Sequence, residues 1–307
     1  MTGYPNEINR LPRRLKPGDT IGIAAPAGPF DRGLFHRGTR VLEEMGFNVF
    51  MPEGLFEVDG YLAGDDDHRA RLVNELFADN NVHAVMCARG GYGCMRILPL
   101  LDYPTIKNNP KVFMGFSDIT ALLSVLLSRC GLVSFHGPVV TSLAEASGTE
   151  RQALLEAVSS AGPFQIRAPD GITLSPGSES GILCGGNLTI LCHLVGTPFA
   201  PDFVGKILFL EDRGEAPYRI DRMLVHMKLA GCFDDLAGLV LGLFKDCGQP
   251  EDIFRIVGDV FGDCHLPILA GLEVGHGNLN LTLPVGVEAT LDADRRVLSY
   301  HRAATTD

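Results

Sequence analysis

The feature that most constrains the fold of this chain is a regular alternation of short apolar runs and amphipathic stretches in its first half. Strand-like runs are expected at residues 20–25, 47–51, 82–88 and 111–115, and stretches with helical spacing at 31–45, 65–78 and 118–129. Strands that alternate with helices pair in parallel through right-handed crossovers. The sequence therefore predicts an α/β fold, with an open parallel sheet and helices on both faces. In such sheets ligands bind at the carboxyl ends of the strands.

The pattern changes after about residue 148. Residues 161–180, AGPFQIRAPDGITLSPGSES, are rich in Gly, Pro and Ser, which is typical of a connection between domains. Beyond them the pattern is mixed, with several short strands separated by turns. We therefore expect an N-terminal α/β domain at 1–160 that carries the nucleophile, a linker at 161–180, and a smaller β-rich domain at 181–307.

Composition argues against several classes of function. The net charge of −11 argues against nucleic acid as a partner, because phosphate binding needs a basic surface. Trp is absent and aromatic residues make up 7%, so no stacking platform for bases or sugar rings is expected. The eight cysteines show neither C-x-x-C nor zinc-ligand spacing, as in a protein with reduced thiols. No secretory signal and no apolar run of ~20 residues is visible, so we expect a cytoplasmic protein that does not bind membranes.

The segment from Lys111 to Arg129, KVFMGFSDITALLSVLLSR, combines a short apolar strand with an amphipathic helix, and Ser117 lies at the turn between them. At such a turn a serine hydroxyl is exposed beside free N–H groups of the helix, which can stabilise an oxyanion. This arrangement is typical of a nucleophile in acyl transfer. Ile119 replaces the second glycine of G-x-S-x-G, however, and Ser117 can equally be a helix N-cap, with Asp118 in the first turn.

A nucleophilic serine needs a base and a group that orients the base. Among nine histidines, His276 lies between two glycines that leave its imidazole uncrowded, although an exposed turn histidine has the same pattern. His136, at a predicted strand end, is the second candidate. Glu211 and Asp212 end an apolar strand at 207–210, where a carboxylate is costly unless it is paired. The sequence thus offers two bases and two orienting carboxylates.

Six blocks of the sequence together resemble the LD-carboxypeptidase family. They are ARGGYGCMRILPLLD (88–102), GFSD (115–118), FHGP (135–138), GGNL (185–188), FLEDRGEAPYRIDRML (209–224) and GHGNLNLTLPVG (275–286). The blocks occur in the family's order and cover most of the chain from Pro17 onward. The resemblance implies an N-terminal flavodoxin-like domain, a β-rich C-terminal domain and a homodimer.

The resemblance also implies roles for individual residues. Ser117 corresponds to the family's nucleophile, His276 to its histidine and Glu211 to the glutamate that orients the histidine. The oxyanion hole is expected from the backbone N–H groups of Asp118 and Gly91.

A carboxypeptidase must also bind the free carboxylate of its substrate, for which the forked guanidinium of an arginine is suited. Arg89 and Arg213 are near the predicted site in the sequence, and Gly90 is a further candidate for substrate contact. Both arginines can equally form ion pairs of the scaffold.

From the resemblance we expect hydrolysis of the amide between an L-centred diamino acid and the terminal D-alanine of a muropeptide. The reaction passes through an acyl-enzyme and needs neither a metal nor an organic cofactor. A first alternative is a related serine peptidase that cleaves a peptidyl-nucleotide antibiotic, which the absence of Trp disfavours. A second is a non-catalytic α/β binding protein in which Ser117 only caps a helix.

Overall fold

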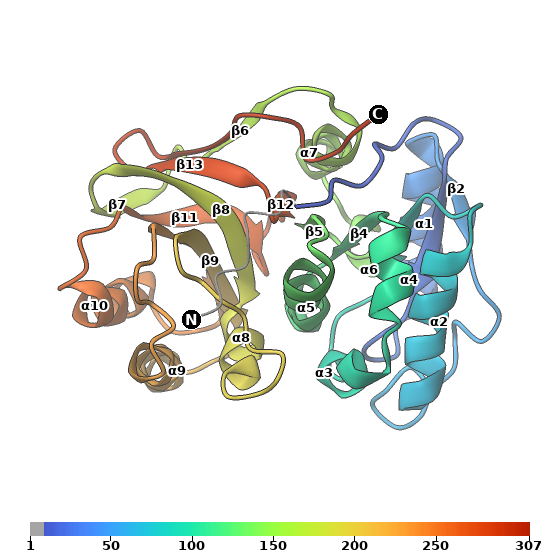
Figure 1. Ribbon diagram of the computed structural model, residues 1–307, viewed down its shortest axis with the longest axis horizontal. Helices are drawn as coiled ribbons and strands as arrows, with labels where there is room; N and C mark the ends of the chain where they lie inside the picture. The colour runs from blue at the N-terminus through green and yellow to red at the C-terminus, as the bar shows by residue number, and fades with distance from the viewer. Residues whose placement is uncertain (1–8) are drawn as a thin grey trace.

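The computed structural model describes residues 9–307, which form two sheets with helices packed around them (Figure 1). The first sheet contains β1 (Thr20–Ala24), β2 (Asn48–Phe50), β3 (Ala84–Cys87), β4 (Val112–Gly115), β5 (Ser134–His136) and β12 (Leu283–Val285). Its order is β12-β5-β4-β3-β1-β2, in which β1 to β5 are parallel and β12 runs antiparallel to β5. The predicted open parallel sheet is therefore confirmed.

Helices cover both faces of this sheet, as predicted. They are α1 (Arg32–Glu44), α2 (Asp66–Ala78), α3 (Cys94–Ile97), α4 (Tyr103–Asn108), α5 (Thr120–Cys130), α6 (Val140–Leu143) and α7 (Gly148–Ser159). The apolar side chains of α1, α6 and α7 belong to one buried cluster, and those of α2 to α5 belong to another on the opposite face. Strands β3 and β4 are buried along their whole length, which explains why their sequences are continuous apolar runs.

The second sheet has eight strands. They are β6 (Phe164–Arg167), β7 (Ile172–Ser175), β8 (Ser178–Asn187), β9 (Lys206–Arg213), β10 (Gly238–Lys245), β11 (Ile268–Gly275), β13 (Glu288–Asp292) and β14 (Val297–Tyr300). Their order is β6-β14-β13-β8-β9-β10-β11-β7, and the central strands β8 to β11 are parallel. The helices α8 (Leu188–Leu194), α9 (Pro217–Leu229) and α10 (Pro250–Phe261) contribute to a buried cluster on one face of this sheet.

Residues 161–180, expected to be a linker, are part of this second sheet. They contain β6 and β7, which form its two edges by antiparallel pairing with β14 and β11. Their Gly and Pro residues lie at the ends of these four-residue strands, so a composition typical of a linker here marks closely spaced turns.

The two halves of the chain share strands and core. Residues 283–285 cross from the second half to form β12, where Leu283 pairs with His136 of β5. Alternate residues of β9 point to opposite faces, so that Phe209 joins the same cluster as Phe135 of the first sheet, whereas Leu210 faces the helices. The shared strand and the shared core therefore fix the positions of the two sheets relative to each other.

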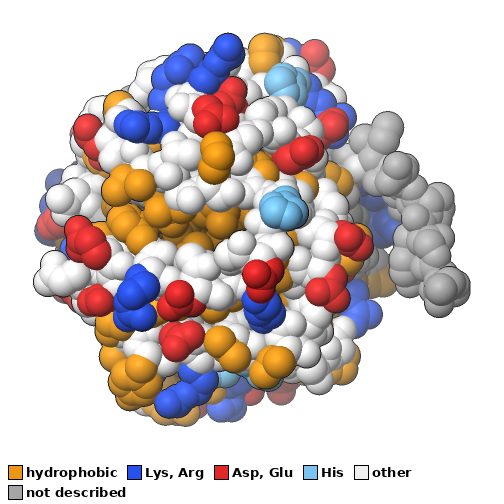
Figure 2. Space-filling model, turned by 90° about the vertical axis from the view of Figure 1, so that its left-hand side faces the viewer, with side chains coloured by type: hydrophobic (Ala, Val, Ile, Leu, Met, Phe, Trp, Pro, Cys, Tyr) orange, Lys and Arg blue, Asp and Glu red, His pale blue; other side chains and the backbone are white. Residues whose placement is uncertain are grey.

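An apolar hollow lies on the face of the molecule near α10, between charged side chains (Figure 2). Its cavity of about 380 Å³ is lined by apolar side chains that include Ile172, Leu243, Phe244, Ile253 and Phe254. Across residues 9–307, none of the helices has the length and apolar character needed to cross a membrane.

Candidate active site

Ser117 lies at the turn between β4 and α5, at the carboxyl end of a buried strand. It begins a 3-10 turn, and its φ of 65° is in the left-handed region that non-glycine residues rarely adopt. Gly115 permits this turn, because a Cβ there would lie 2.8 Å from Cγ2 of Ile119. Within residues 9–307 neither the turn nor α5 receives a side-chain capping bond, so Ser117 is not the helix cap.

Glu211, near the end of β9, and His276, directly after β11, form a hydrogen-bonded pair. Nδ1 of His276 lies 2.6 Å from Oε2 of Glu211, and the backbone N–H of His276 donates to the same oxygen at 3.2 Å. Glu211 is fully buried. Gly275 must be glycine at this point, because its φ is 98° and a Cβ would lie 2.5 Å from that carboxylate oxygen. The carboxylate therefore sets both the orientation and the tautomer of the imidazole.

The pair lies next to the serine turn. The ring centroid of Phe116, the residue before Ser117, is 4.9 Å from that of His276. A direct hydrogen bond between Ser117 and His276 is absent among the described residues, as is common before substrate binds. The structure thus brings the three predicted residues to one place although they come from two different sheets.

Asn187, which no sequence pattern marks as a candidate, connects the two sheets at this site. Its Nδ2 donates to Oε1 of Glu211 at 3.3 Å and to Oδ1 of Asp212 at 3.0 Å, and its backbone N–H donates to Oγ1 of Thr120 at 3.0 Å. Thr120 is the first residue of α5, three positions after Ser117. The only signal in the sequence was its place in the GGNL block at the end of a strand.

Asp212, the other candidate carboxylate, does not contact the imidazole. It accepts hydrogen bonds from the backbone N–H of Thr189 at 2.9 Å and from its hydroxyl at 2.7 Å, in addition to the one from Asn187. Burial, together with the nearby Glu211 carboxylate, raises the pKa of Asp212. The geometry therefore assigns the contact with His276 to Glu211 and a supporting position to Asp212.

The glycine loop after β3 packs directly against the serine turn. A Cβ on Gly90 would lie 2.9 Å from Cβ of Ser117, and Gly91 has a φ of 121°. The Asp118 carboxylate holds this loop by accepting the backbone N–H of Cys94 at 2.8 Å, and burial raises its pKa. The backbone N–H of Asp118 lies in the first turn of the 3-10 segment, where it has no acceptor within the helix.

The remaining candidates occupy other surroundings. Arg89 is exposed and donates to the carbonyl of Pro29 at 2.7 Å, whereas Arg213 forms an exposed ion pair with Asp246 at 3.6 Å. His136 is fully buried, and neither of its ring nitrogens has a hydrogen-bond partner among residues 9–307. Burial lowers its pKa to about 4. His136 has no carboxylate to orient it, and this geometry favours His276 as the base.

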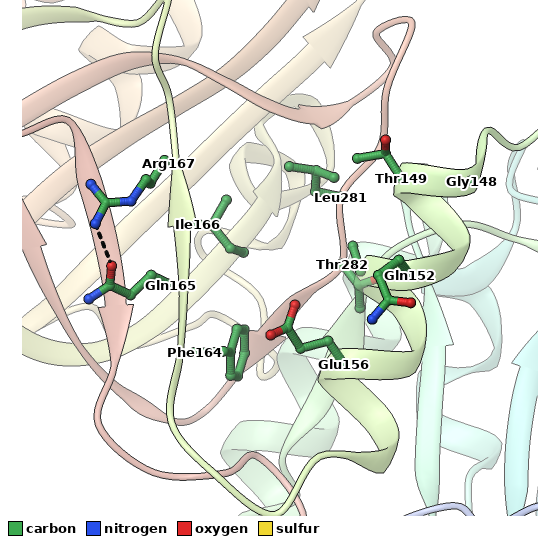
Figure 3. Close-up of a pocket in the computed structure, with 11 residues that line it drawn as sticks. Gly148, Thr149, Gln152, Glu156, Phe164, Gln165, Ile166, Arg167, Leu281 and Thr282 are labelled. Carbon is green, nitrogen blue, oxygen red and sulfur yellow. Dashed lines mark hydrogen bonds between the residues drawn. The ribbon is translucent and has the colours of Figure 1, made fainter.

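A residue of α7 holds the C-terminal end of the loop that carries His276. Glu150 accepts the backbone N–H of Asn280 at 3.1 Å, and Oδ1 of Asn280 accepts that of Gly275 at 2.9 Å. A cavity of about 460 Å³ opens beside this anchor, between α7 and β6, with Leu281 and Thr282 in its wall (Figure 3). None of the candidate catalytic residues lines it. Within residues 9–307 no group of three or more His, Cys, Asp and Glu is arranged to hold a metal ion.

Comparison with known proteins identifies the class. A model of the LD-carboxypeptidase N-terminal domain matches residues 21–137, and one of the LD-carboxypeptidase C-terminal domain matches residues 180–291. A probable murein peptide carboxypeptidase of Bacillus subtilis is 35% identical, over 93% of this chain and 92% of that protein. A murein tetrapeptide carboxypeptidase of Pseudomonas aeruginosa is 34% identical, over 90% of this chain and 94% of that protein.

Solved structures share the fold over nearly the whole chain. MccF in complex with glutamyl sulfamoyl guanosine matches with a TM-score of 0.90 at 26% identity, covering 96% of this chain and 99% of that one. A muramoyltetrapeptide carboxypeptidase from Oxalobacter formigenes matches with a TM-score of 0.83 at 31% identity, covering 94% and 100%. The fold and these relatives define a serine-type carboxypeptidase. The chain belongs to the LD-carboxypeptidase family, which confirms the resemblance seen in its sequence blocks.

Proposed function

We propose that this protein removes the terminal D-alanine from the tetrapeptide stem of a muropeptide by cleaving the amide that follows an L-centred diamino acid. The observation that carries this proposal is the 2.6 Å hydrogen bond between Nδ1 of His276 and Oε2 of Glu211, beside the strained turn of Ser117. The names of the Bacillus and Pseudomonas relatives support murein peptides as the substrate class.

In the proposed reaction, Oγ of Ser117 attacks the carbonyl carbon of the diamino acid, and Nε2 of His276 takes the hydroxyl proton. The carbon–nitrogen bond then breaks, and His276 returns the proton to the amine of the leaving D-alanine. Water, deprotonated by His276, attacks the resulting ester, and the proton passes back to Ser117. Glu211 keeps the proton on Nδ1 and stabilises the imidazolium in both steps.

The oxyanion formed at the carbonyl needs donors that are already in place. The backbone N–H groups of Asp118 and Gly91 are suited to this role, because the glycine loop packs against Ser117 and Asp118 holds the loop through Cys94. Each such donor is typically worth about 3 kcal/mol in the transition state.

The direct test is mass spectrometry of the purified protein after incubation with a muramoyl-tetrapeptide, beside the Ser117→Ala variant. We expect the wild type to release one alanine and the variant to release none. A serine-reactive fluorophosphonate should likewise label the wild type and not the variant. Turnover by the variant would refute the assignment of the nucleophile, and a wild type that is labelled but leaves the muropeptide intact would refute the substrate.

A second candidate substrate is a peptidyl-nucleotide, favoured by the TM-score of 0.90 to MccF bound to glutamyl sulfamoyl guanosine. The same serine, histidine and glutamate would cleave its amide. The chain contains no Trp that could stack on a base. Competition between a peptidyl-sulfamoyl-adenosine and the muramoyl-tetrapeptide, measured as kcat/KM for each, decides between the two substrates.

A further inference from the structure

Two exposed tyrosines lie side by side at the rim of the candidate site. The ring centroids of Tyr61 and Tyr92 are 5.6 Å apart in an edge-to-face arrangement. Their exposed fractions are 65% and 53%, so both rings are open to a ligand. The absence of Trp and the low aromatic content led us to expect no stacking surface, but the fold pairs two tyrosines that are far apart in the chain.

The pair lies where open α/β sheets bind ligands. The strand order reverses between β1 and β3, and the loops that follow these two strands meet, with the N–H of Gly28 donating to the carbonyl of Gly90 at 3.3 Å. Tyr92 is two residues beyond Gly90, whose Cα packs against Ser117. Tyr61 reaches the same place, because its carbonyl lies 3.4 Å from the Cβ position of Gly28.

The chemistry of the proposed reaction indicates which part of the substrate lies beside the two tyrosines. The leaving amine must be near His276, which returns a proton to it. His276 approaches Ser117 from the β5 side of β4, where it neighbours His136, whereas β3 and β1 lie on the other side. The acyl part of the substrate therefore extends over the glycine loop toward Tyr92 and Tyr61.

We propose that Tyr61 and Tyr92 form a stacking platform for the sugar ring of a muropeptide, an inference that rests on the proposed function. In a muramoyl-tetrapeptide about three residues separate the scissile amide from the sugar. These residues span roughly 10 Å when the peptide is extended. Tyr92 is within about 7 Å of Gly90 along the chain, and Tyr61 lies one ring further. An aromatic face packs against the apolar C–H face of a sugar, while the phenol hydroxyls can bond its polar edge.

The test compares two substrates, a muramoyl-tetrapeptide and the same tetrapeptide without the sugar. We expect the wild type to prefer the sugar-bearing substrate by roughly threefold to tenfold in kcat/KM, in line with aromatic contacts elsewhere. The double variant Tyr61→Ala, Tyr92→Ala should cleave both substrates equally, with the change mainly in KM. Because both rings are more than half exposed, their removal leaves the core intact.

Two controls separate stacking from other effects. The double variant Tyr61→Phe, Tyr92→Phe keeps the rings and should keep most of the preference. Tyr218→Ala removes an equally exposed tyrosine, at 58%, from α9 in the second half and should leave the preference unchanged. The inference is overturned if both peptides are cleaved but the double alanine variant keeps the preference for the sugar-bearing substrate. It is also overturned if the wild type cleaves both peptides equally well. A wild type that cleaves neither peptide overturns the proposed function as well.

Discussion

Replacing Glu211 by glutamine should abolish most activity while leaving the fold intact. Three donors face the carboxylate: Nδ2 of Asn187 at Oε1, and Nδ1 and the backbone N–H of His276 at Oε2. A glutamine must place an NH₂ group against one of these donors. Asn187 cannot turn its amide to accept, because Nδ2 also donates to Asp212 and Oδ1 caps α8 by accepting the N–H of Ile190 at 3.1 Å.

Both orientations of the glutamine impair catalysis. With NH₂ toward His276, Nδ1 becomes an acceptor and the proton moves to Nε2, where the base must be free. With NH₂ toward Asn187, the tautomer survives but the imidazolium loses its carboxylate at 2.6 Å. At an effective dielectric constant of about 20, that attraction amounts to about 4–6 kcal/mol, or on the order of 10³- to 10⁴-fold in kcat. The unpaired donor should lower the free energy of unfolding by about 1–3 kcal/mol.

The assay is kcat for D-alanine release together with urea denaturation of the same preparations. The matched control is Asp212→Asn, the next residue of β9, which is also buried and accepts several donors but none from His276. We expect the control to lose comparable stability and to keep kcat within about tenfold. A Glu211→Gln variant that retains kcat within tenfold of the wild type would refute the role of Glu211, as would equal loss of activity in both variants.

Three further predictions follow from the same geometry. Ser117→Gly should be inactive and up to about 1 kcal/mol more stable in urea denaturation, because glycine tolerates the φ of 65°; lower stability would contradict strain at this turn. Gly90→Ala should lose fluorophosphonate labelling, because its methyl group would meet Ser117 at 2.9 Å, whereas Gly162→Ala, with nothing within 4 Å, should label normally. The pKa of His136 is about 4 in the folded protein and 6.5 in the unfolded chain, so the unfolded chain binds a proton more readily. The free energy of unfolding should therefore fall as the pH drops from 6.5 to 4. The free energy of unfolding should lose about 3 kcal/mol less over that interval in His136→Phe than in the wild type, and parallel pH profiles would contradict this.

The parts of the fold that could be predicted are those that depend on patterns within a few neighbouring residues. The buried parallel strands are continuous apolar runs. Helix α2 begins within one residue of the predicted stretch at 65–78, and the Asp65 side chain caps it by accepting the N–H of His68 at 2.7 Å. The turn at Ser117 was also readable, because a glycine, a serine and a helix pattern follow one another there. Backbone preference and side-chain period act over a few residues, so the sequence alone carries this information.

The edges of the sheets were not predictable in the same way. Strands β6, β7 and β12 have three or four residues each, and their flanking Gly and Pro read as turns. What makes β12 a strand is its pairing with β5, about 150 residues away in the chain, where Leu283 lies opposite His136. Such pairing depends on packing of the whole molecule, because a short edge strand has little propensity of its own.

The sequence by itself determined the α/β class, the position of a turn at Ser117, and which residue types carry the chemistry. Only the tertiary structure decided that Glu211, and not Asp212, meets a histidine 65 positions away, that Asn187 connects both carboxylates to the helix after Ser117, and that two distant tyrosines share one rim. The physical reason is the distance along the chain over which each interaction acts. Local sequence sets the conformation of each turn and strand, whereas the choice between neighbouring carboxylates depends on which face of β9 meets the loop after β11.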